Sequence, residues 1–311
     1  MKHIAPDYYL KFRCIGGKCR HNCCIGWEID IDEDTLHFYQ SVGGELGEQL
    51  RKNICTTDDP PHFILGEHER CPFLNKDNLC DLIIAQGEGA LCQICDDHPR
   101  FYNEWNNSLE MGVGLCCEEA ARLVLSGTAP VELVTVAEDE EEAQPSDAEE
   151  ALFLHRARLF DALWQDFPLD EKLTQVLEMA EITLPDKSFG QWAAFYQTLE
   201  QLDPAWYHLL EKLKLGPSVL PDQQWDGAFA RLAHYFIYRH ASGVEDAYEY
   251  SLRVAFAVLS VRMIRALCGV LLGENGELTL DDVAEMARMY SSEVEYSDEN
   301  AEAILDAIAG Y

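Results

Sequence analysis

The cysteines of this chain are confined almost entirely to its first third. Eleven of the 12 cysteines lie between Cys14 and Cys117, and only Cys268 lies beyond them. The opening residues, MKHIAPDYYLKFRC, lack the apolar stretch of a secretory signal, so we expect a cytoplasmic protein. In a reducing compartment, thiols at this density are typical of metal ligands rather than of disulfides. The sequence therefore predicts a metal-binding module in the first third.

The spacing of the cysteines favours iron–sulfur over zinc. The first group, Cys14-x4-Cys19-x3-Cys23-Cys24, includes two glycines whose backbone freedom lets a short loop fold around one metal centre. The second group is more widely spaced: Cys71-x8-Cys80-x11-Cys92-x2-Cys95-x20-Cys116-Cys117. Zinc sites usually show two C-x2-C pairs, and this chain has one. Irregular gaps and adjacent cysteines suit a cubane cluster, and zinc remains the alternative.

Several nearby side chains have a functional and a simpler interpretation. His98 could be a metal ligand, although a histidine in a surface turn is the commoner case. Arg100 and Glu110 could pair with a substrate or cofactor, but a structural salt bridge is the more frequent role of such residues. Cys55 and Cys268 lie outside both cysteine groups, and we expect them to be structural or incidental.

The sequence predicts a mainly α fold. Residues 1–127 are rich in turn formers, with helical pieces expected at 34–39 and 118–125, and predict an irregular cysteine-rich metal-binding module. Residues 128–150 contain AEDEEEAQPSDAEE and no Lys or Arg, which predicts an exposed acidic linker. Residues 151–311 repeat apolar side chains at helical spacing, behind a capping signature at Ser146 and Glu149, and predict a helical bundle.

Charge and hydropathy exclude two classes of partner. With 56 acidic and 23 basic residues the net charge is −33, so nucleic acid and anionic membranes should be repelled and a cationic protein surface attracted. Solubility alone is the simpler and commoner reason for such a charge. The longest apolar run, VAFAVLSVRMIRALCGVLLG, carries Arg262 and Arg265 in its middle. A membrane span would not readily tolerate both charges, so this run predicts a buried helix.

Four motifs together resemble one known family. YLKFRCIGGKCRHNCCIGW, at residues 9–27, resembles the opening of the flagellin lysine N-methylase family, which belongs with zinc- or iron-chelating proteins named for a CxxCxxCC motif. CPFLNKDNLCDL, ICDDHPRFYN and LEMGVGLCCEEAARLVL are similar, in the same order, to its later motifs, with Cys117 where a proline is usual. In the C-terminal half, ARLAHYFIYRH and YSSEVEYSDEN are similar more loosely. There Ser292 and Tyr296 stand where the family tends to show an arginine and a histidine, departures that bear on catalytic competence.

The resemblance implies a ligand set, a cofactor and a reaction. The positions that match the family's cysteines are Cys14, Cys19, Cys23, Cys24, Cys71, Cys80, Cys95 and Cys116. It implies an iron–sulfur cluster, 4Fe-4S by preference, and transfer of a methyl group from S-adenosylmethionine to lysines of flagellin or another lysine-rich protein. Eight thiols exceed what one cubane needs, so either a second metal is bound or some are structural.

The sequence leaves open where the methyl donor binds and whether the protein is an enzyme. No glycine-rich nucleotide loop follows a visible strand, so we expect the methyl donor to bind at an open iron rather than in a Rossmann fold. The alternative function is a non-catalytic zinc- or iron-chelating or electron-transfer protein with a helical partner-docking domain.

Overall fold

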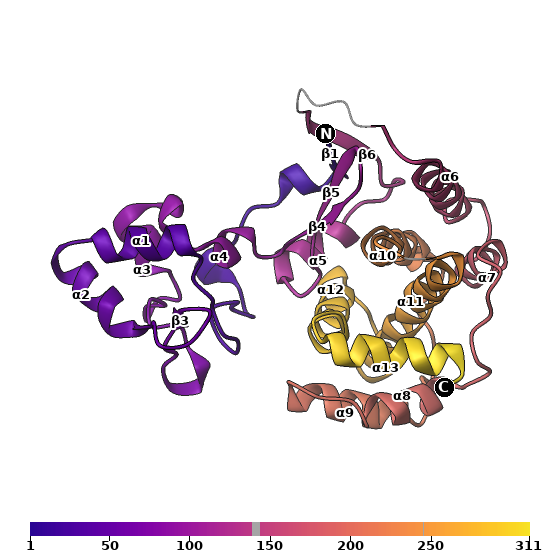
Figure 1. Ribbon diagram of the computed structural model, residues 1–311. Coiled ribbons are helices and arrows are strands. Elements are labelled where there is room, and N and C mark those ends of the chain that lie inside the picture. The colour runs from indigo at the N-terminus through magenta and orange to yellow at the C-terminus, as the bar shows by residue number, and fades with distance from the viewer. Residues whose placement is uncertain (139–143, 245) are drawn as a thin grey trace. The chain divides into compact units, whose positions relative to one another are not determined.

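The computed structural model describes residues 1–138, 144–244 and 246–311. The chain divides into two compact units, drawn in Figure 1. Residues 13–100 form what we call the cysteine unit, and residues 1–12 with 101–311 form the helical unit. The division differs from the predicted boundary after residue 127, because residues 101–127, with Cys116 and Cys117, pack with the N-terminal strand and the helices rather than with residues 13–100.

The cysteine unit is built from short elements joined by turns. They are the helices α1 (Glu33–Ser41), α2 (Gly44–Asn53), α3 (Asp81–Gln86) and α4 (Gln93–Asp97) and the strands β2 (Ile54–Cys55) and β3 (His62–Phe63). The helix expected at 34–39 is confirmed as α1, which begins where the Asp32 carboxylate accepts a hydrogen bond from the amide of Thr35 at 2.9 Å. A small apolar core that includes Tyr39, Phe63 and Phe73 fills the unit.

A four-stranded sheet in the helical unit was not predicted. Its strands are β1 (Lys2–Pro6), β4 (Arg100–Glu104), β5 (Ser108–Val113) and β6 (Leu133–Glu138), in the order β4-β5-β1-β6. β1 runs parallel to β5 and antiparallel to β6. β6 lies inside the predicted acidic linker, where alternating Leu, Val and Thr side chains form an edge strand. Residues 139–143 of that linker lie outside the described residues.

The rest of the helical unit confirms the mainly α prediction. Its helices are α5 (Glu118–Leu125), α6 (Asp147–Ala162), α7 (Leu169–Met179), α8 (Phe189–Tyr196), α9 (Pro204–Leu213), α10 (Asp226–His240), α11 (Ala247–Asn275), α12 (Leu280–Tyr290) and α13 (Asp298–Ala309). A π-helical turn, η6 (Ser291–Glu295), follows α12. The predicted capping box begins α6, with the Ser146 amide donating to Glu149 at 2.7 Å.

Helix α11 lies at the centre of this unit. It packs against α7, α9, α10, α12 and α13 (Figure 1). It is long and apolar enough to cross a membrane, yet 78% of its most apolar window is buried inside the protein. The guanidinium of Arg265 pairs with the exposed carboxylate of Asp170, on α7, at 2.9 Å. The prediction of a buried core helix is therefore confirmed.

One ion pair is enclosed between the sheet and the helices. The guanidinium of Arg156, on α6, donates through Nη1 to the Glu110 carboxylate of β5 at 2.9 Å and through Nη2 to its other oxygen. Both side chains are only 3% exposed. Trp105 Nε1 donates to the same carboxylate at 3.1 Å. The structural interpretation of Glu110 is therefore confirmed.

A buried histidine should make the helical unit sensitive to acid. His234, on α10, stacks on Phe160 with ring centroids 3.8 Å apart, and neither ring nitrogen has a hydrogen-bond partner among the described residues. Burial, with help from Arg156 and Arg231, lowers the pKa of His234 to about 3. In the unfolded chain a histidine takes up a proton near pH 6.5, so the folded state loses stability as pH falls from there towards 3.

We expect His234→Phe to reduce this acid sensitivity. The wild type should lose about 1.4 kcal/mol per pH unit from this group over that window, and the variant should lose none of it. Urea unfolding at several pH values measures the slope, with the exposed His208→Phe as the control that keeps it. Equal slopes in the wild type and His234→Phe would contradict the prediction.

Candidate metal centre

Five cysteines from separate segments contact the same small core of the cysteine unit. The five are Cys24, Cys71, Cys80, Cys92 and Cys95. The Cys71 amide donates to the Cys24 carbonyl at 2.8 Å, so two segments distant in sequence are joined at their cysteines. Cys80 pairs with Leu74 in an isolated β-bridge and precedes α3. Cys92 precedes α4, and the Cys95 amide donates to its carbonyl at 3.0 Å.

Electrostatics shows that these thiols also interact with one another. The pKa of Cys71 rises to about 11, mainly through burial and in part through the nearby Cys80 and Cys92 sulfurs. Charge on Cys71 and Cys80 contributes to a raised pKa at Cys24, and charge on Cys24 and Cys71 does the same at Cys95. All five thiols of this core therefore lie close enough to influence one another's ionisation.

Two pairs of neighbouring thiols share a proton. A hydrogen bond from Cys24, supported by His98 and opposed by burial, lowers the pKa of Cys23 to about 4, while the pKa of Cys24 is raised. The same hydrogen bonding lowers the pKa of Cys92 and raises that of Cys95. Without a bound cation only some of these thiols can be ionised, because the negative charge of one thiolate raises the pKa of the thiols beside it. A bound cation removes that repulsion and lets all of the thiols ligate, which is the donor chemistry of a metal centre.

The structure brings together five of the eight predicted ligands. These are Cys23, Cys24, Cys71, Cys80 and Cys95. Cys14 is exposed, and its sulfur accepts a hydrogen bond from the Gly16 amide at 3.4 Å. The Cys19 thiol donates to the His21 carbonyl at 3.1 Å. Cys116 belongs to the helical unit, where it shares a hydrogen bond with the hydroxyl of Tyr296.

Sequence reasoning left out one member of the group. Cys92 is fully buried among these thiols although the predicted ligand set omits it. Its C-x2-C spacing from Cys95 was the signal that could have included it. His98 also differs from the expected surface turn, because it is half-buried, hydrogen-bonds Cys23 and lies with its ring 5.8 Å from that of Trp27.

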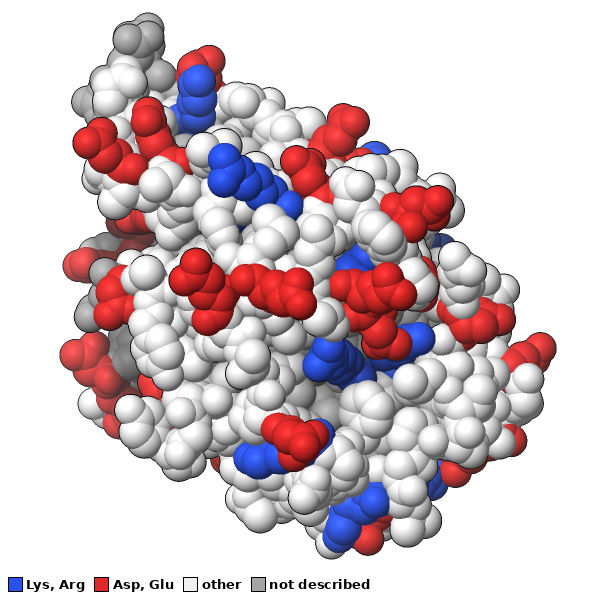
Figure 2. All heavy atoms as spheres, turned by 90° about the vertical axis from the view of Figure 1, so that its right-hand side faces the viewer, with Lys and Arg blue, Asp and Glu red and all other residues white. Residues whose placement is uncertain are grey.

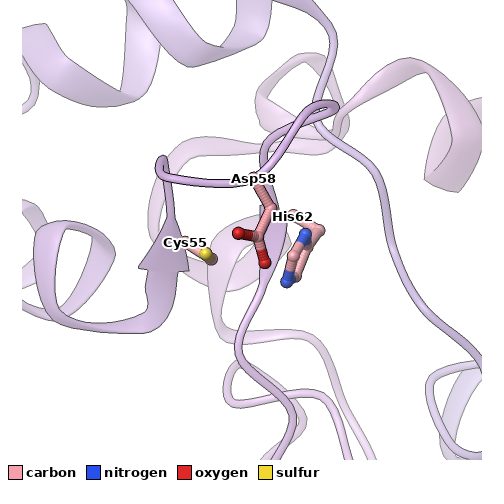
Figure 3. A group of neighbouring side chains, drawn as sticks. All are labelled: Cys55, Asp58 and His62. Carbon is pink, nitrogen blue, oxygen red and sulfur yellow. The ribbon is translucent and has the colours of Figure 1, made fainter.

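Arg100, Cys268 and Cys55 lie outside the group of five converging thiols. Arg100 donates to the Asp96 carbonyl at 2.7 Å. Cys268 is completely buried in α11, and its predicted structural role fits this position. Cys55 lies at the end of β2 beside Asp58 and His62 (Figure 3). Among the described residues, these three are the one group of His, Cys, Asp or Glu whose ligand atoms all lie within 4.8 Å of one another.

A second polar cluster lies in the helical unit around Glu295. Its carboxylate, on η6, is fully buried and accepts hydrogen bonds from Tyr235 Oη at 3.1 Å and His240 Nε2 at 2.7 Å. Arg239 Nε lies 3.6 Å away. Burial opposes ionisation of Glu295, but the charge of Arg239 and the His240 hydrogen bond outweigh it and lower its pKa. Sequence reasoning missed this cluster, although Arg239 and His240 stand out at the end of an apolar helix.

Tyr296 and Ser292, which depart from the family pattern, both contact arginines. The Arg239 guanidinium lies between the rings of Phe101, at 4.9 Å, and Tyr296, at 4.7 Å. A Cβ on Gly114 would meet the Tyr296 hydroxyl at 2.1 Å, so any larger residue there would displace that hydroxyl. Ser292 Oγ accepts a hydrogen bond from Arg288 Nη1 at 3.4 Å. A guanidinium therefore lies beside Ser292 although the residue itself is not an arginine.

Comparison with known proteins points to one family. Residues 158–310 match the model of the FliB lysine N-methylase C-terminal domain. The lysine-N-methylases of Salmonella typhimurium and Salmonella choleraesuis are each 28% identical to the chain over 137 residues, which cover 40% of this chain and 34% of each relative. The flagellar biosynthetic protein FliU of Salmonella muenchen is 27% identical over 137 residues, which cover 80% of that protein.

The match is partial in length. The chain covers about a third of the two lysine-N-methylases, at 34%. No solved structure matches it significantly. The family-model match falls in the helical unit and includes His240, Glu295 and Tyr296. The match over residues 158–310, just under half of the chain, together with the named relatives supports kinship with the flagellin lysine N-methylase family.

Proposed function

We propose that this protein is a lysine N-methyltransferase that depends on an iron–sulfur cluster, uses S-adenosylmethionine and acts on lysines of flagellin. The observation that carries the proposal is the combination of two features in one chain. Thiols converge in the cysteine unit, and the other unit contains the lysine N-methylase C-terminal domain.

The spacing of the thiols supports iron–sulfur over a single zinc ion. With zinc–sulfur bonds of about 2.3 Å, a tetrahedral zinc holds its sulfurs roughly 4 Å apart. No three of the described thiols have their sulfurs all within 4.8 Å of one another. A cubane, with iron atoms at several corners, takes ligands that are farther apart. The group therefore suits a polynuclear centre.

We assign the central ligands to Cys24, Cys71 and Cys95, because they contact the same core and the Cys71 amide donates to the Cys24 carbonyl, and because charge on Cys24 and Cys71 raises the pKa of Cys95. With these three protein ligands, a 4Fe-4S cluster keeps one iron open, and such an iron supplies a binding position for the methyl donor. A fourth thiolate, from Cys80 or Cys92, would instead close the cluster and leave no such position.

The protein's own charge favours its proposed substrate. A lysine must lose its proton before it attacks a methyl group, and its ordinary pKa is about 10.4. The net charge of −33 attracts a lysine-bearing surface. Figure 2 shows acidic side chains spread over one face of the protein, with fewer Lys and Arg among them. The reacting amine then needs an apolar pocket in which the neutral form is favoured.

The test is anaerobic purification followed by analysis of metal, sulfide and methyl transfer. We expect a brown protein with roughly four iron and four sulfide ions per chain. It should transfer label from S-adenosylmethionine to flagellin lysines, and the apoprotein should not. A colourless protein with bound zinc would favour the chelating alternative. A brown protein that transfers no label would favour an electron-transfer role.

A further inference from the structure

The hairpin of β2 and β3 brings three potential metal ligands together outside the candidate metal centre. Cys55 and His62 are directly opposite each other in the strand register, so their side chains leave the same face of the hairpin. Asp58 lies in the connecting loop and turns back towards them (Figure 3). One ligand atom from each lies within 4.8 Å of the other two. Asp58 is exposed while Cys55 and His62 are half-buried, so the site is open to solvent on one side.

His62 also has the hydrogen-bond partners that a metal-binding histidine usually shows. Its Nδ1 lies 3.0 Å from Glu28 Oε1 and 3.2 Å from the Pro60 carbonyl oxygen. Two acceptors at Nδ1 place the ring proton there and leave the lone pair of Nε2 free. A metal-binding histidine usually donates a hydrogen bond to a carboxylate from the ring nitrogen that does not bind the metal. This contact is independent of the clustering of the three ligands.

We propose that Cys55, Asp58 and His62 bind one zinc ion, with Nε2 as the histidine donor and a fourth position open to water. One thiolate, one imidazole and one carboxylate form a mixed set that zinc accepts. None of the thiols that converge in the candidate metal centre belongs to this set. The bound ion would close the loop between β2 and β3.

The experiment uses the anaerobically purified full-length protein, titrated with Co²⁺ as a spectroscopic probe for zinc. We expect one equivalent to bind with visible bands of a four-coordinate ion and a thiolate-to-cobalt charge-transfer band, and Zn²⁺ to displace it. Cys55→Ser should abolish the charge-transfer band. Asp58→Asn and His62→Gln should each weaken binding more than about 100-fold, since even outer partners cost 10–100-fold. Absorbance of the candidate metal centre, subtracted as the baseline, should stay constant.

Two surface variants make the test specific. Glu28→Gln, whose side chain is 63% exposed, should weaken binding by about 10–100-fold without touching the ion. Asp59→Asn, the neighbouring exposed carboxylate in the same loop, should leave affinity unchanged. The proposal is overturned if Cys55→Ser still binds as many equivalents of Co²⁺ as the wild type. It is equally overturned if Asp59→Asn weakens binding as much as Asp58→Asn. If circular dichroism shows that Cys55→Ser does not fold, Glu28→Gln is the deciding variant. An affinity of Glu28→Gln for Co²⁺ equal to that of the wild type then overturns the proposal.

Discussion

Replacing Cys95 with serine is expected to lower bound iron from roughly four ions per chain to less than one. Cys95 interacts with both of the other central thiols, Cys24 and Cys71, so its loss opens the middle of the group. Methyl transfer to flagellin should fall by more than about 100-fold, because a lost ligand costs more than the 10–100-fold of an outer partner. Iron analysis, the visible spectrum and the methyl-transfer assay measure the effect.

Cys268→Ala is the matched control for this change. Cys268 is completely buried in α11 and belongs to the helical unit, so the variant removes a thiol without removing a proposed ligand. Iron content should equal that of the wild type. Full iron content in Cys95→Ser would contradict the assigned centre, and iron loss in Cys268→Ala would show that the assay reports general damage.

The second large effect is expected at Glu110. Glu110→Gln should lower the free energy of unfolding of the helical unit by about 3–5 kcal/mol, because Arg156 would stay buried without its counter-charge. The Arg156 guanidinium lies over the rings of Phe153, at 5.2 Å, and Tyr238, at 5.5 Å, so water cannot easily replace the carboxylate. Tryptophan fluorescence in a denaturant titration follows this unit, since only Trp27 of the 6 tryptophans lies in the cysteine unit.

An exposed ion pair provides the comparison. Glu274 lies 2.8 Å from Lys212, and the two side chains are 45% and 50% exposed. Glu274→Gln removes the same charge and should cost no more than about 1 kcal/mol. Similar losses in the two variants would mean that enclosure of the Glu110 pair does not matter.

The helices were accessible from the sequence because their signals are local. The spacing of apolar residues, together with caps such as Asp32 and Ser146, lies within a few residues of each helix start. Strand β1 pairs with residues about a hundred positions away, and no local pattern specifies that partner. Acidic composition around β6 also concealed a short run of strand-forming residues.

For the candidate site, the sequence predicted the kind of site but not which residues form it. Cysteine density indicated a metal module, but which thiols meet depends on contacts such as the one between Cys24 and Cys71. Family resemblance then omitted Cys92, whose position only the folded core reveals. The cluster at Glu295 joins residues 60 positions apart in sequence, Tyr235 and Glu295. Such partners become visible only when α10 and η6 are packed together.

The strand order β4-β5-β1-β6 has a consequence for how the gene can be shortened. β1 is an inner strand of the sheet, and Tyr238 Oη, on α10, donates to the Ile4 carbonyl at 3.1 Å. A fragment that starts after residue 100, made to express the helical unit without the cysteine unit, would lack this strand. It would leave β5 and β6 with open edges, which are sites of aggregation. A soluble deletion should instead retain residues 1–12 and splice them to residue 101.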